Sequence, residues 1–275
     1  ELVMPAPIVL VTGASSGIGA ATARLLLERG WRVFAAARRL EAMEPLAALG
    51  AEVMALDLSD DQSRRELAEQ LTAKVGALDA LVNNAGVAVF KPLLETTFQE
   101  WRHVFATNLD GAFLCTQFCA PVMLRNGGGS IVNMLADMWG GMPGMGHSGA
   151  ARAGMENFTK TAAYEWGHAG VRVNAVAPGW IASSGMDTYP ESMKTMIRSL
   201  KDHVPLQRIG SESEVASAIV FLLTPGANFI SGNTIRIDGA ASQGTRAWTL
   251  GKAKNSETYN GFHRAYMPDV LKDQE

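Results

Sequence analysis

The sequence is poor in cysteine and in long apolar runs. Only two of its 275 residues are cysteines, and Cys115 and Cys119 lie four positions apart, where an expected helix would bury both as small apolar side chains. This scarcity excludes a disulfide framework and predicts no metal site. No stretch of about 18 apolar residues occurs, and the first residues lack the charged start and apolar core of a signal peptide. We therefore expect a soluble, cytoplasmic protein without a membrane partner.

A dominant charge of one sign is also lacking. The 24 lysines and arginines nearly balance the 27 aspartates and glutamates, which gives a net charge of -3 and no basic block. Proteins that follow phosphate backbones carry such blocks, so nucleic acid is not the expected partner. With 47% hydrophobic and 19% charged residues, the chain can bury a sizeable core as one large α/β domain or two small ones.

The sequence does contain a glycine-rich turn at residues 9–19, which read VLVTGASSGIG. An apolar strand that stops at such a turn and continues into a helix points the free N–H groups of the helix's first turn at a ligand. Gly13 suits a backbone angle that side chains resist, Gly17 suits close approach of a ligand, and Gly19 suits packing of the helix on the sheet. The turn therefore predicts a pyrophosphate site, although turn geometry alone also favours glycine.

Strand and helix patterns alternate regularly along the rest of the chain. Apolar runs predict strands at residues 31–37, 52–56, 80–82, 130–134, 171–176 and 234–237. Helical segments separate these runs, including one that a capping box at Thr97 and Glu100 opens and that we expect to continue through residue 124. This alternation predicts an α/β fold with a doubly wound parallel sheet and helices on both faces. Residues 183–204 are expected to form a substrate-side insertion with short helices.

The end of the second predicted strand indicates which dinucleotide binds. In a dinucleotide fold this position meets the adenosine ribose, where an acidic residue would accept hydrogen bonds from the 2′-hydroxyl of NAD. Here Ala37 stands at that position, and Arg38 and Arg39 follow. Guanidinium groups suit a 2′-phosphate, so NADP(H) is favoured over NAD(H), although the arginines could instead start a solvated helix. Asp57, at the end of the third strand, either meets the adenine or makes a turn.

Five motifs together resemble the short-chain dehydrogenase/reductase family. In family order they are TGASSGIG at residues 12–19, NNAG at 83–86, NLDG at 108–111, APG at 177–179 and IDG at 237–239. The resemblance implies a single Rossmann-like domain over residues 1–241, a C-terminal extension over 242–275, and a homodimer or homotetramer acting on a small molecule. By the same resemblance, the cofactor-binding residues are Gly13, Ser15, Ser16, Gly17, Ile18, Gly19, Arg38, Arg39, Asp57, Leu58, Asn84, Ala85, Gly86, Arg152, Pro178, Gly179, Ile181 and Ser183.

The family's catalytic tyrosine and lysine are missing from this chain. They form a Tyr-x-x-x-Lys motif, and none of the four tyrosines here has a lysine at that spacing. Aligned on the helix, the tyrosine falls on Ser148 and the lysine on Arg152, while the family's serine falls on Leu135 or Ala136. Only Asn108 remains of the catalytic four. Arg152 can still bond the ribose hydroxyls, but the Ser148 hydroxyl is too weak an acid to replace tyrosine unaided.

The stretch HSGAARAG at residues 147–154 resembles the family branch of trans-2-enoyl-CoA and 2,4-dienoyl-CoA reductases. Those enzymes can place a tyrosine two residues beyond this stretch, where this chain has Glu156 followed by Lys160. A spacing of four puts Ser148, Arg152 and Glu156 on one helix face, so Glu156 is the first candidate for a proton donor. The alternative is a surface Glu156 that pairs with Lys160.

Two further acids are candidates for the same role. Asp137 follows the fifth predicted strand directly, and His147 precedes Ser148 on the helix. The candidate catalytic residues are therefore Asn108, Asp137, Ser148, Arg152 and Glu156.

Three functions fit these observations. The first is an NADP(H)-dependent reductase of an activated C=C bond, such as that of a trans-2-enoyl-CoA, because this chemistry first needs donors that stabilise an oxyanion. The second is an alcohol or carbonyl oxidoreductase, for example on terpenoid alcohols, with an unusual proton relay. The third is a nucleotide-binding sensor or oligomer partner without catalysis.

The last residues are too aromatic for a plain linker. They include Trp248, Tyr259, Phe262, His263 and Tyr266. We expect this extension to cover either the substrate cleft or a neighbouring subunit.

Overall fold

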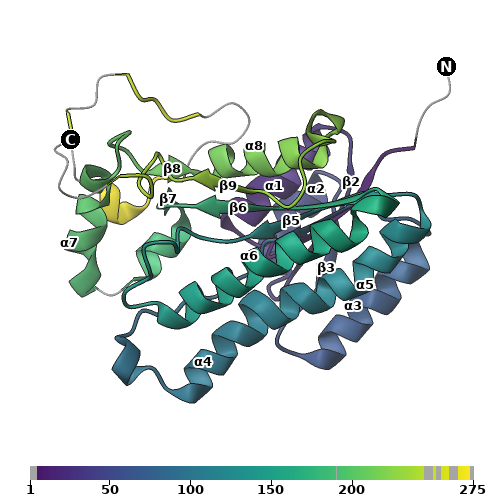
Figure 1. The fold of residues 1–275 in the computed structure, drawn as a ribbon, viewed down its shortest axis with the longest axis horizontal. Coiled ribbons are helices and arrows are strands. Elements are labelled where there is room, and N and C mark those ends of the chain that lie inside the picture. The colour runs from purple at the N-terminus through teal and green to yellow at the C-terminus, as the bar shows by residue number, and fades with distance from the viewer. Residues whose placement is uncertain (1–4, 190, 245–249, 252–254, 260–265, 273–275) are drawn as a thin grey trace.

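Seven parallel strands form the central sheet in the computed structural model of this chain, which describes residues 5–189, 191–244, 250–251, 255–259 and 266–272. The strand order is β3-β2-β1-β4-β5-β6-β9, so the predicted doubly wound sheet is confirmed (Figure 1). The strands are β1 (Ile8–Thr12), β2 (Arg32–Ala37), β3 (Glu52–Ala55), β4 (Ala80–Asn83), β5 (Gly129–Met134), β6 (Val171–Pro178) and β9 (Thr234–Ile237), with β7 (Ile181–Ala182) and β8 (Gly210–Ser211) paired separately. The order reverses between β1 and β4, and open parallel sheets bind ligands beyond the carboxyl ends at such a point.

Helices cover both faces of this sheet (Figure 1). One face carries α1 (Gly17–Glu28), α2 (Glu44–Ala48) and α8 (Glu212–Leu223), and the other carries α3 (Asp61–Lys74), α5 (Gly111–Arg125) and α6 (Gly146–Trp166). Two further helices are α4 (Phe98–Phe105), which packs beside α6, and α7 (Glu191–Ser199), which lies in the predicted insertion. No helix in the described part of the chain is long and apolar enough to span a bilayer.

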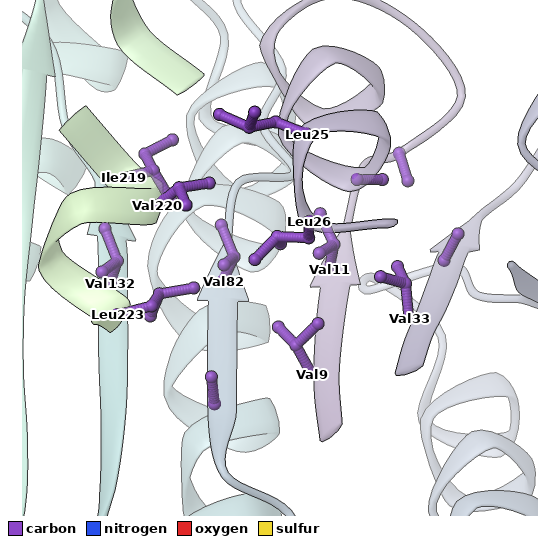
Figure 2. Close-up of a cluster of buried hydrophobic side chains, with 14 of the residues drawn as sticks. Val9, Val11, Leu25, Leu26, Val33, Val82, Val132, Ile219, Val220 and Leu223 are labelled. Atoms are coloured by element: carbon purple, nitrogen blue, oxygen red, sulfur yellow. The ribbon is translucent and has the colours of Figure 1, made fainter. Parts of the chain in front are cut away.

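Valines of adjacent strands form the core beneath α1 and α8. Figure 2 shows these side chains together with the leucines and isoleucine that cover them, namely Val9, Val11, Val33, Val82, Val132, Leu25, Leu26, Ile219, Val220 and Leu223. All of them are buried, and each buried side chain of this kind contributes about 1.5–3 kcal/mol to the free energy of unfolding. Near-continuous valine and leucine runs are therefore strands here because both faces of the sheet are covered.

A buried polar pair ties the middle of the sheet to the helices on its other face. The side-chain amide of Asn83 on β4 donates to Asn133 Oδ1 on β5 at 2.9 Å and to Thr116 Oγ1 on α5 at 2.8 Å. Asn133 in turn donates to Thr159 Oγ1 on α6 at 2.9 Å. Buried hydrogen bonds of this kind are costly to lose, so they hold α5 and α6 at a fixed position over the sheet.

The helix predicted from residue 97 to 124 begins as expected and then changes its winding. The capping box of Thr97 and Glu100 is present, but a π-helical turn (Ala106–Asp110) separates α4 from α5. Asn108 lies in this turn, where its side chain accepts from Val87 N at 2.8 Å and donates to Val87 O at 2.9 Å. The uninterrupted α-helix was therefore a wrong prediction, since the apolar periodicity does not show the wider turn that aims Asn108 at Val87.

The insertion and the described turn Asp269–Leu271 of the C-terminal extension lie together at one end of the molecule (Figure 1). The turn Asp269–Leu271 lies against α7, where Val270 is buried with Met186, Ile197 and Leu200. Trp248, Phe262 and His263, which the sequence placed in an aromatic extension, lie outside the described residues.

The loops that follow β1 and β4 are locked together at the carboxyl edge of the sheet. Thr12 Oγ1 accepts the backbone N–H groups of Asn84 and Ala85 at 3.1 and 3.2 Å, and Asn84 Nδ2 donates to the carbonyl oxygens of Thr12 and Gly13. Gly13 has a φ of +68°, and a Cβ on it would lie 2.7 Å from Ala85 Cα. Gly19 is equally confined, because its Cβ would lie 2.3 Å from the Gly13 carbonyl oxygen.

We expect Gly13→Ala to destabilise the protein more than Gly30→Ala. Gly30 has a φ of +78° but nothing within 4 Å of an added Cβ, so its substitution costs backbone strain alone, about 1–2 kcal/mol. Gly13→Ala adds a steric clash with Ala85, which we expect to destabilise the protein by about 1–3 kcal/mol more. Urea unfolding of the two variants measures the difference, and equal losses would show that the two loops can separate freely.

Candidate active site

The start of α1 leaves room for a phosphate group. Gly17 has a φ of +61°, and the nearest atom to an added Cβ is Glu212 Oε1 at 3.6 Å. Ser16 is the N-cap residue but makes no side-chain capping bond, and the first turn contains no acidic residue. The N–H groups and the positive end of the helix dipole therefore face a cradle that suits a pyrophosphate.

A small cavity of about 300 Å³ lies between this loop and the ends of β2 and β3. It collects most of the residues predicted to hold the adenosine half of the cofactor, namely Gly13, Ser15, Ser16, Arg38, Arg39, Asp57, Leu58, Asn84, Ala85 and Gly86. The remaining two glycines of the loop, Gly17 and Gly19, lie behind it at the helix start.

Arg39 lines this cavity and lies against the glycine-rich loop. Its Nη2 donates to Ser15 Oγ and Ser16 Oγ, both at 3.4 Å. Asp57 also lines the cavity, and its carboxylate accepts from the Ser59 hydroxyl at 2.6 Å and the Ser59 N–H at 2.9 Å. These bonds hold the pKa of Asp57 below its usual range. The structure thus shows the turn that was one interpretation of this residue, and contact of Asp57 with the adenine stays a prediction.

A second, larger cavity of about 1340 Å³ adjoins the first, because Asn84, Gly86 and Val87 line both. The carboxyl ends of β4, β5 and β6 form its floor, α6 forms one wall, and residues 183–204 form another. It brings together the predicted residues Ile18, Asn84, Gly86, Asp137, Ser148, Arg152, Pro178, Gly179, Ile181 and Ser183.

Arg152 occupies the junction of the two cavities. Its Nη1 donates to the carbonyl oxygen of Met134, and its Nη2 lies where a Cβ on Gly86 would come within 2.5 Å. Its Nε is buried and has no hydrogen-bond partner within the described residues. Burial lowers the pKa of the guanidinium to about 10, so the group stays positively charged at neutral pH.

Ser148 lies in the wall of the large cavity, whereas Asn108 lies outside both cavities. Ser148 is buried on α6 and lines the large cavity, while its backbone N–H donates to His147 Nδ1 at 2.9 Å. His147 lies behind Ser148 and does not line the cavity. Asn108 lines neither cavity, because both ends of its amide bond Val87. It is therefore a positioning residue for the loop after β4.

Asp137 and Glu156, the two carboxylic acid candidates, lie in different surroundings. Asp137 lines the large cavity, and burial raises the pKa of its carboxyl, with Asp238 raising the pKa further and Arg236 opposing the change. Glu156 does not line the cavity, and its carboxylate accepts from Lys160 Nζ at 2.9 Å. Glu156 therefore forms the ion pair that was the alternative to its role as proton donor, and the choice between the two acids as proton donor stays a prediction.

The sequence did not single out the apolar lining of the large cavity. Five methionines contribute to it, which are Met134, Met142, Met145, Met186 and Met196. Tyr189 of the insertion also lines it and packs edge-on against Phe90, with ring centroids 5.4 Å apart. The 13 methionines of the chain and an aromatic residue inside the insertion were the available signals.

Comparisons with known proteins agree with this geometry. The family model described as "Enoyl-(Acyl carrier protein) reductase" matches residues 13–242. A 3-oxoacyl-[acyl-carrier-protein] reductase FabG of Staphylococcus epidermidis is 36% identical over 238 residues, which are 84% of this chain and 96% of that protein. A probable 2,4-dienoyl-CoA reductase of Bacillus subtilis is 36% identical over 241 residues, 84% of this chain and 94% of that protein.

A solved structure is more similar in sequence. The citronellol catabolism dehydrogenase (AtuB) of Pseudomonas aeruginosa PAO1 is 50% identical, with a TM-score of 0.74 over 88% of this chain and 99% of that one. The family-model match and these relatives each span most of the chain. The protein therefore belongs to the short-chain dehydrogenase/reductase family of NAD(P)-dependent oxidoreductases.

Proposed function

We propose that the protein is an NADP(H)-dependent reductase of a C=C bond conjugated to a carbonyl group, with an enoyl thioester such as a trans-2-enoyl-CoA as the favoured substrate. The observation that carries this proposal is the α6 wall of the large cavity, which presents Ser148 and Arg152 and no phenol–ammonium pair. Reduction of a ketone needs an acid that protonates oxygen. Conjugate reduction instead sends the proton to carbon and needs first a set of donors to the carbonyl oxygen.

The residues of the two cavities suit a nicotinamide dinucleotide. The cradle at Gly17 and the first turn of α1 would hold the pyrophosphate, and Arg38 with Arg39 would hold a 2′-phosphate. The buried, unpartnered Nε of Arg152 supports a polar ligand group at the junction of the cavities. When bound there, NADPH supplies a hydride to the β-carbon of the substrate.

The protein's own groups then serve the substrate. The Ser148 hydroxyl donates a hydrogen bond to the carbonyl oxygen, where negative charge collects as the β-carbon gains the hydride. The positive charge of Arg152 lowers the energy of that oxyanion, because charges attract each other more strongly in a partly buried site than in water. Asp137 is the acid that delivers a proton to the α-carbon, and the C=O bond re-forms as the C=C bond becomes saturated.

A second function is favoured by the charge of the large cavity. Arg152 is the one lysine or arginine among its described lining residues, so the phosphates of coenzyme A would find no other cation there. A neutral, flexible, apolar molecule fits the methionine-rich lining better. AtuB, by its printed name, acts in citronellol catabolism. An acyclic terpenoid alcohol or aldehyde is therefore the alternative substrate, with the proton passing to or from its oxygen.

The homodimer or homotetramer that the family resemblance implies stays a prediction. Phe98 on α4 and Phe113 on α5 support it, because both are large apolar side chains that are exposed on the surface of the chain.

We expect NADPH to be consumed with crotonyl-CoA or a longer enoyl-CoA, and not with simple ketones. Parallel assays of citronellol with NADP⁺ test the alternative function. Activity on citronellol alone would replace the first proposal with the second. No turnover with any of these compounds, despite tight binding of NADPH, would favour the nucleotide-binding protein without catalysis.

We expect NADPH to bind more tightly than NADH. Charge-assisted hydrogen bonds contribute about 1.5–3 kcal/mol, so Arg39→Ala should weaken NADPH about tenfold to hundredfold and leave NADH unchanged. Arg38→Ala tests the second guanidinium, and Arg29→Ala at the exposed end of α1 is the matched control. Titration by tryptophan fluorescence measures each affinity, and equal affinities of the two dinucleotides for the parent would contradict the assignment.

We expect Asp137→Asn to lower kcat by about 10² or more and Glu156→Gln to leave it within a few-fold. A proton donor is active while protonated, so kcat of the parent should fall as pH rises through the raised pKa of Asp137. That fall should be absent from the residual activity of Asp137→Asn and retained in Glu156→Gln. The reverse pattern would return the role to Glu156, against its ion pair with Lys160.

A further inference from the structure

Tyr189 lines the large cavity, and its hydroxyl group is free to bond a ligand there. Among the described residues that line the cavity it is the one tyrosine, and its hydroxyl makes no hydrogen bond within the part of the chain that the structure describes. The ring is half-buried and meets the Phe90 ring edge-on at an interplanar angle of 70°. Phe90 follows β4, so the contact of Tyr189 with Phe90 joins the insertion to the loop after β4 in the cavity lining.

The backbone beside Tyr189 is held by the C-terminal extension. Asp187, two residues earlier, accepts from the Tyr266 hydroxyl at 2.6 Å and from Val270 N at 3.5 Å. Met186 is buried against Val270 in the same cluster. These contacts fix the segment that carries Tyr189, and burial raises the pKa of its phenol, which keeps the hydroxyl a donor at neutral pH.

We propose that the Tyr189 hydroxyl donates a hydrogen bond to the oxygen atom of the substrate and so supplies, from the insertion, the phenol that α6 lacks. This role rests on the proposed function only in placing a substrate oxygen in the large cavity, and it holds for a thioester, an aldehyde or an alcohol. Together with Ser148 it gives the oxygen two donors from different elements of the cavity lining, α6 and the insertion. Hydride and proton balance is unchanged, because Tyr189 keeps its proton.

Kinetics of Tyr189→Phe test the role directly. The substitution keeps the ring and its contact with Phe90 and removes only the hydroxyl. Loss of one oxyanion donor typically costs about 10²-fold or more, so kcat/KM should fall by about that factor while NADPH affinity stays constant. Tyr164→Phe is the matched control, since Tyr164 is 92% exposed on α6 and should show parent kinetics.

Binding measurements distinguish a hydrogen bond from the Tyr189 hydroxyl from simple packing of its ring. They also do not depend on which reaction the protein catalyses. The probes are citronellol and the hydrocarbon of the same skeleton that lacks the hydroxyl group, each titrated by tryptophan fluorescence with Trp180 in the cavity wall. Tyr189→Phe should weaken citronellol about fivefold and leave the hydrocarbon unchanged, as expected for one hydrogen bond. This result would support the role even if no enoyl-CoA is reduced.

Two outcomes would overturn the role of Tyr189. One is a kcat/KM for Tyr189→Phe within twofold of the parent on any substrate that the parent converts. The other is an equal loss of affinity for citronellol and for the hydrocarbon, which would show that the ring only packs against the ligand.

Discussion

The approach of Gly13 to Ala85, too close for one added methyl group, is the constraint on which the rest of the site depends. It joins the loop after β1, which starts α1, to the loop after β4, which leads toward Asn108. The loop that begins α1 and the loop at the floor of the large cavity are therefore held against each other. Gly86 lies at the same place, where an added Cβ would displace the guanidinium of Arg152.

Different kinds of structural element form the cofactor half and the substrate half of the proposed site. Strand ends, short loops and backbone hydrogen bonds make the cofactor half, and such elements hold geometry closely. Methionines and the insertion make the substrate half, and unbranched thioether side chains can repack around apolar chains of different shape. The structure thus combines closely held loops around the smaller cavity with an adaptable lining of the larger one.

Local sequence signals were sufficient for the sheet and for the glycine-rich turn. Glycines, strand runs and capping residues act within a few positions of themselves, so the turn at Gly13 and the cap at Thr97 could be predicted directly. The position of Glu156 relative to the large cavity could not be predicted in this way. Periodicity puts Glu156 on the face of Arg152, but four residues of α-helix advance by about 6 Å, which is enough to leave the cavity. Tyr189 reaches the cavity only through folding of the insertion.

The π-helical turn before α5 sets a limit on how this chain can vary in length. It holds one residue more per turn than an α-helix, and that residue determines where the Asn108 amide points. The wider turn absorbs its extra residue, so deleting a single residue between Ala106 and Asp110 would restore ordinary winding and leave the faces of α4 and α5 aligned as they are. The Asn108 amide would then no longer face Val87, so shortening this segment would release the loop after β4 while α4 kept its packing.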